Sequence, residues 1–141
     1  MRLHLHARAS IGAAIFAYAL ATFSVLATPV QALAAAQDYR FEAAGPPAKS
    51  GKATIVKIRL VHLPDGKPVS GAVIFQTRFD MAPEGMASMT APAKVVRTSE
   101  ANLYQLELEP PMGGNWALSL SAKVQGETET VNGTVPITIQ K

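Results

Sequence analysis

Apolar and polar side chains alternate through most of the chain after residue 52, in short stretches that turn residues separate. In residues 53–62 three aliphatic side chains share one face and two basic side chains share the other, a period of two that is typical of a half-buried strand. The other stretches that alternate or are rich in β-branched residues are 38–42, 72–79, 93–98, 102–109, 116–124 and 127–140. No helical period is found after residue 36, so the chain is predicted to be all-β.

These stretches are short, and most of them have one polar face. About seven strands in the last 105 residues predict an antiparallel, immunoglobulin-like β-sandwich, because strands with a polar face do not fit a parallel sheet covered by helices. The chain has no Cys, so its stability depends on the two inner faces, and Trp116 is predicted to be a large buried anchor. Asn132-Gly133 predicts a tight turn or bulge, and Pro136 suits an edge strand.

The first 36 residues have the pattern of a secretory signal peptide. Arg2 and Arg8 precede an uncharged stretch of 17 residues, 11–27, and Pro29 and several small residues follow it, as at a signal-peptidase site. The alternative is an uncleaved anchor, since 17 apolar residues are at the lower limit for a membrane span. We therefore expect a periplasmic or otherwise exported protein, with inner-membrane anchoring as the alternative.

The charge of the chain depends on that signal. The whole chain has a formal charge of +3, but residues 1–36 hold two arginines and no acid, which leaves 11 basic and 10 acidic residues after them. A net charge of +1 there argues against a nucleic-acid partner, and membrane contact is expected only through an uncleaved signal. Residues 37–51 are predicted to be an N-terminal strand and linker, and residues 52–141 the sandwich domain.

The sequence contains no obvious catalytic set. One His, no Cys and scattered carboxylates follow residue 36, so no nucleophile, base and orienting group can be assigned. Asp65 precedes Gly66 in a turn and is expected to bond its own backbone. No glycine-rich loop opens a helix, as phosphate binding would require. We expect a protein that is not an enzyme.

Methionines are concentrated in one segment. Residues 80–92 hold three of the four methionines that follow residue 36, namely Met81, Met86 and Met89, and Met112 lies in a second segment rich in Pro and Gly. Spacings of five and three fit neither a strand face nor a helix stripe. Residues 80–92 are therefore predicted to be an irregular loop, with all four methionines on loops.

Thioether sulfur is a soft, uncharged ligand that suits Cu(I), and it survives in compartments where free thiols are oxidised. We expect Met81, Met86, Met89 and Met112 to bind Cu(I), with the His62 imidazole and the Trp116 ring as weaker candidates. In the alternative, the methionines are flexible packing or a contact surface that docks a metal transporter or an oxidase subunit. A third candidate, a binder of small apolar ligands, requires a cavity.

Four parts of the sequence resemble the YtkA-like/FixH-like domain family. They are Asp65-Gly66-Lys67-Pro68-Val69-Ser70-Gly71-Ala72-Val73, the segment of Met81, Met86 and Met89, Leu103-Tyr104, and Met112-Gly113-Gly114-Asn115-Trp116. The likeness covers most of residues 52–140. It implies a bacterial exported or membrane-tethered immunoglobulin-like sandwich, and some relatives are associated with copper delivery to respiratory oxidases or with heavy-metal efflux. FixH-like proteins stay anchored in the membrane, which a cleaved signal would not fit.

Overall fold

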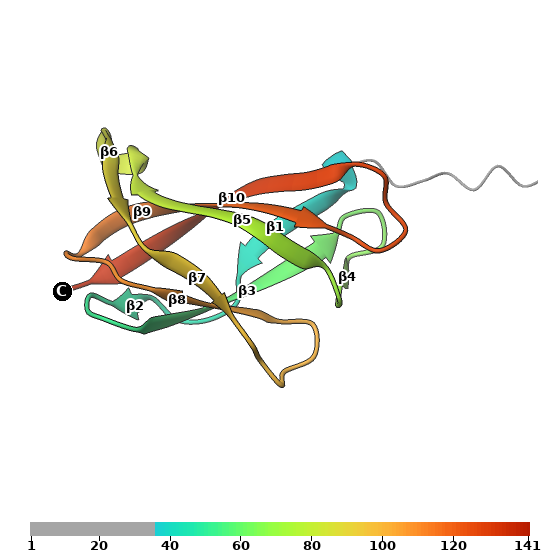
Figure 1. Cartoon of the computed structure of the whole chain (residues 1–141), viewed down its shortest axis with the longest axis horizontal. Helices are drawn as coiled ribbons and strands as arrows, with labels where there is room; N and C mark the ends of the chain where they lie inside the picture. The colour runs from blue at the N-terminus through green and yellow to red at the C-terminus, as the bar shows by residue number, and fades with distance from the viewer. Residues whose placement is uncertain (1–35) are drawn as a thin grey trace, which may run out of the picture. The chain divides into compact units, whose positions relative to one another are not determined.

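A computed structural model describes residues 36–141, which form two packed β-sheets (Figure 1). The prediction of an all-β sandwich is confirmed. The predicted signal peptide lies outside the described residues except for Ala36. Within the described part of the chain, no helix has the length and apolar character needed to cross a membrane.

The first sheet has the strand order β1-β3-β8-β7, and β4 pairs with the end of β3. Its strands are β1 (Tyr39–Ala43), β3 (Thr54–His62), β4 (Lys67–Pro68), β7 (Ala93–Val96) and β8 (Tyr104–Leu108). All of these pairs are antiparallel. The short edge strand that was predicted near residue 93 is β7.

The second sheet has the order β2-β10-β9-β5-β6. Its strands are β2 (Ala48–Lys49), β5 (Val73–Met81), β6 (Met86–Ala91), β9 (Gly114–Lys123) and β10 (Thr130–Gln140). β2 runs parallel to β10 and the other pairs are antiparallel, so this sheet is mixed. Two short 3-10 helices, η1 (Ala36–Asp38) and η2 (Ala82–Glu84), complete the described elements. Residues 37–51 thus contribute a strand to each sheet.

The core lies between the sheets and consists of the side chains that alternate inward. The predicted inner faces of β3 and β9 are buried, namely Val56, Ile58, Leu60, Trp116, Leu118, Leu120 and Ala122, with Val124 beyond β9. Trp116 is fully buried, as predicted, and its ring stacks on that of Phe79 with the centroids 4.6 Å apart. This stack joins β5 to β9 inside the sandwich.

The prediction of an irregular loop over residues 80–92 is wrong. β5 extends to Met81, η2 follows, and β6 returns from Met86. Met81 pairs with Met86 whereas its neighbour Asp80 pairs with Thr90, so three residues of β6 lie between two adjacent register positions. Such a bulge removes the period of two from the sequence, which is why alternation did not identify the strand.

The prediction of a turn or bulge at Asn132-Gly133 is also wrong. Both residues lie inside β10 and pair in regular register with Ser121 and Leu120. Gly133 is required by packing, because a Cβ at this position would lie 2.8 Å from the ring carbon Cδ2 of Phe41 on the facing sheet. The glycine thus admits a large side chain from β1 into the core.

We expect Gly133→Ala to lower the free energy of unfolding by about 1–3 kcal/mol, the usual cost of overpacking a core. The measurement is urea unfolding followed by tryptophan fluorescence. Gly45→Ala is the matched control, because a Cβ there would meet nothing within 4 Å. Equal stability of the two variants would show that Phe41 does not depend on the glycine.

Candidate metal site

The two methionine-bearing segments meet at one end of the sandwich, which we call the methionine end. The first is the turn from β5 through η2 to β6. The second runs from the loop between β8 and β9, which contains Met112, into Asn115 at the start of β9. Oε1 of Glu84 accepts hydrogen bonds from the backbone N–H of Asn115 at 3.1 Å and from its side-chain Nδ2 at 2.8 Å. These bonds join the two segments across 31 residues of sequence.

A close packing contact reinforces this junction. The terminal methyl of Met81 lies 2.8 Å from the position that a Cβ on Gly114 would take. Gly114 also has a φ of +144°, which favours glycine. Any other residue at this position would clash with Met81 and strain the start of β9.

The four methionines differ in exposure. Met81 is 2% exposed, whereas Met86, its register partner, is 38% exposed. Met89 and Met112 are 37% and 44% exposed. The prediction that all four methionines lie on loops is therefore wrong for Met81, Met86 and Met89, which lie on strands. It is confirmed for Met112. Three of the four methionines are thus partly exposed, and the fourth, Met81, is packed.

A buried carboxylate holds the turn in place. Asp80 is 5% exposed; its Oδ1 accepts the N–H of Ala82 at 3.0 Å and its Oδ2 accepts Nε of Arg78 at 2.6 Å. Arg78 also donates from Nη2 to the carbonyl of Ala87 at 2.9 Å. The bond from Ala82 and the Arg78 guanidinium lower the pKa of Asp80, so this carboxylate is charged and fixes both arms of the turn.

Trp116 lies in the core and not at the surface of the methionine end. It has no exposed area, and one face of its ring is occupied by Phe79. Its indole N–H finds no hydrogen-bond partner among the described residues. The indole ring of Trp116 therefore serves core packing.

His62 is at the other end of the sandwich. Thr54 at the start of β3 pairs with Leu108, close to the loop of Met112, and His62 ends the same strand eight residues later. At about 3.3 Å per residue, the two ends of β3 are about 26 Å apart. Figure 1 shows β6 at one end and β4, which pairs with His62, at the other. The structure does not bring His62 to the methionines.

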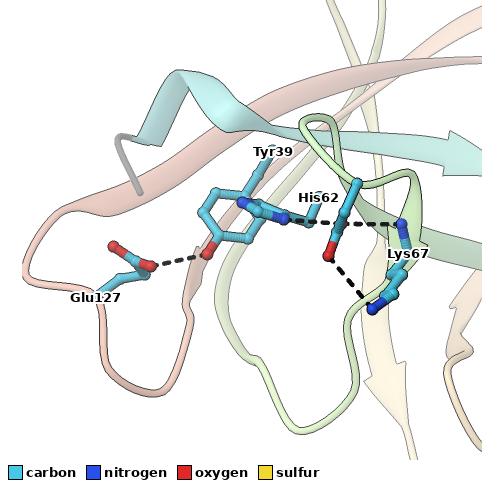
Figure 2. A network of polar contacts seen from close by, with 5 residues as sticks. Tyr39, His62, Lys67 and Glu127 are labelled. Carbon is cyan, nitrogen blue, oxygen red and sulfur yellow. Dashed lines mark hydrogen bonds and ion pairs between the residues drawn. The ribbon is translucent and has the colours of Figure 1, made fainter. Parts of the chain in front are cut away.

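Local contacts hold His62 in place (Figure 2). Its Nδ1 lies 2.9 Å from Oδ1 of Asp65, which also accepts the N–H of Lys67 at 3.1 Å, confirming that Asp65 bonds its own turn. The ring of Tyr39 lies 5.1 Å from that of His62, and its hydroxyl donates to Glu127 at 2.8 Å. Burial and this bond raise the pKa of Tyr39 to about 12, so the phenol remains a donor.

Two residues of the methionine end were not identified from the sequence. Glu84 and Asn115 meet through hydrogen bonds, and nothing in residues so far apart in the chain indicated their pairing. Across residues 36–141, no three His, Asp or Glu side chains gather as metal ligands. The donors that this end offers are thioethers and two carboxylates, Glu84 and Asp80, of which Asp80 is paired with Arg78.

An apolar groove lies elsewhere on the molecule. It has a volume of about 430 Å³ and is formed where the chain passes from β1 to β2, with Pro46 and Pro47 on one side and Pro136 on another. Its apolar lining fits the third candidate from the sequence, a small apolar ligand. No methionine lines it, so it is separate from the candidate metal site.

Comparisons with known proteins give one clear match. A family model described as YtkA-like matches residues 33–121. A search of curated proteins found no match. Among solved structures, the chain is similar to one titled "ZirS C-terminal Domain", with 10% identity, a TM-score of 0.40, and coverage of 100% of this chain and 94% of that chain. A TM-score this low supports no argument about fold or function.

We expect Asp80→Asn to lower the free energy of unfolding at pH 7 by about 1–2 kcal/mol, as for other charge-assisted hydrogen bonds. Because folding lowers the pKa of Asp80, its stabilisation is present above the ordinary carboxyl pKa of about 3.9 and is lost as the pH falls through the folded value. Urea unfolding between pH 7 and pH 3 should show a smaller acid loss in the variant than in the wild type. Glu109→Gln, which removes an exposed carboxylate, should follow the wild type. If the stability of Asp80→Asn fell with pH in parallel with that of the wild type, the charge of Asp80 would not stabilise the turn.

Proposed function

This chain belongs to the YtkA-like family, and from that premise we propose that it binds Cu(I) at its methionine end. The observation that carries the proposal is the junction of two methionine-bearing segments through Glu84 and Asn115. Neutral thioethers from separate segments at one surface are a donor set that suits a soft ion.

The ligand set that we propose consists of Met86, Met89 and Met112, which are exposed enough to reach an ion. Met81 is packed below them and takes the role of a supporting or additional ligand. We leave Trp116 out because it is stacked in the core, and His62 because it ends β3 far from these side chains.

The proposed role is copper handling without covalent chemistry. An exported accessory protein of this kind would buffer Cu(I) or transfer it to a metal transporter or an oxidase subunit. Export rests on the signal-peptide pattern of residues 1–36. Partial exposure of the thioethers supports transfer, because an incoming ligand can reach an ion at the surface without unfolding the site.

Replacement of Met86 and Met112 together by Leu tests the metal site. We expect Cu(I) affinity, measured under reducing conditions against a competing chelator, to fall at least tenfold, because Leu offers no donor atom. The melting temperature should change little, since Leu and Met have similar volumes and both positions are exposed. Phe75→Leu, an exposed apolar change, is the matched control and should leave affinity unaltered. Unchanged affinity in the double variant would refute the assignment.

A second candidate is an interaction module that docks a transporter or oxidase subunit. β6 covers only residues 79–81 of β5, and on the remainder Val73 and Phe75 are 63% and 56% exposed. Contiguous exposed apolar side chains mark contact surfaces, and Val73 and Phe75 would form part of such a patch. Docking would survive the double Leu change, which keeps the apolar surface, but it would be weakened by Phe75→Ser. Copper binding has the opposite pattern.

A further inference from the structure

The charges at the methionine end are unevenly compensated. Asp80 is paired with Arg78 at 2.6 Å, so this pair contributes little net charge. Lys141 brings a basic side chain to the same end, since its Cγ lies 2.9 Å from the position of a Cβ on Gly113. Glu84 accepts both of its hydrogen bonds from the neutral amides of Asn115, and these leave its charge in place.

Glu84 also lies close to Met81. Its Oε1 and the methyl of Met81 lie 3.9 Å and 2.8 Å from one common point, the Cβ position of Gly114. It stands two residues before Met86, and its partner Asn115 stands three residues after Met112. A carboxylate thus lies beside Met81, where the two methionine-bearing segments meet.

We propose that Glu84 supplies the counter-charge of this site, an inference that rests on the proposed Cu(I) binding. Thioethers are neutral, so a bound Cu(I) keeps its full positive charge at a surface that already carries Lys141. The carboxylate of Glu84 supplies one negative charge that offsets the charge of a monovalent soft cation. Hard divalent ions require several oxygen ligands, and no three carboxylate or imidazole side chains gather anywhere in residues 36–141. The site class is therefore Cu(I) or Ag(I).

Glu84→Gln separates the effect of the carboxylate charge from that of the hydrogen bonds to Asn115. Gln keeps a carbonyl oxygen that can accept both bonds from Asn115, so the two segments stay joined, but the negative charge is lost. We expect about a tenfold weaker affinity for Cu(I), which is near the lower end of the range for two charges about 4 Å apart. Ag(I), which is stable to oxidation, should show the same fall. Added salt should weaken wild-type binding more than binding by the variant.

Two further variants test whether Glu84 acts through its charge or only through its hydrogen bonds to Asn115. Glu129→Gln, at the opposite end of β10, should bind as the wild type does. Glu84→Ala removes both the charge and the hydrogen bonds. If Glu84→Gln binds as the wild type does and only Glu84→Ala is weakened, the carboxylate merely joins the segments and this inference is overturned, while Cu(I) binding stands. Failure of the wild type to bind either ion would instead refute the proposed function.

Discussion

The stacking of Phe79 on Trp116 is the contact on which the methionine end depends. Phe79 lies two residues before Met81 and Trp116 lies two residues after Gly114, so one buried ring pair fixes the strands from which both segments leave the core. Without disulfides, burial of such large side chains supplies the main stabilisation of a small sandwich. The position of the methionine end is therefore set by the packing of the core.

Polar contacts then define the turn that the core only anchors. Asp80 holds the start of η2 and, through Arg78, the bulged part of β6. Glu84 makes a separate link, from η2 to Asn115 at the start of β9. Charge-assisted hydrogen bonds of this kind are short and directional, so they position a surface that has few apolar contacts of its own.

The sequence predicted the regular strands and missed the irregular one. Alternation identified the inner faces of β3 and β9 because every second side chain there is apolar and buried. It failed at β6, where the register shift opposite Asp80 breaks the period. It failed at Gly133 because the reason for that glycine, the ring of Phe41, comes from a distant strand. The methionine segments were recognised by composition, whereas their junction through Glu84 is a tertiary contact that no local pattern encodes.

A surface that exchanges a metal ion must be ordered and accessible at the same time. At the proposed site the two requirements would be met by different side chains, since Met81 is packed against Gly114 whereas Met86 and Met112 are partly exposed. A rigid floor reduces the conformational entropy that binding would cost. Exposed thioethers on unbranched side chains can still rearrange to pass an ion to another soft ligand. The proposed site would lie on the bulged edge of one sheet and on the adjoining loop, whereas the regular inner faces of the sheets form the core.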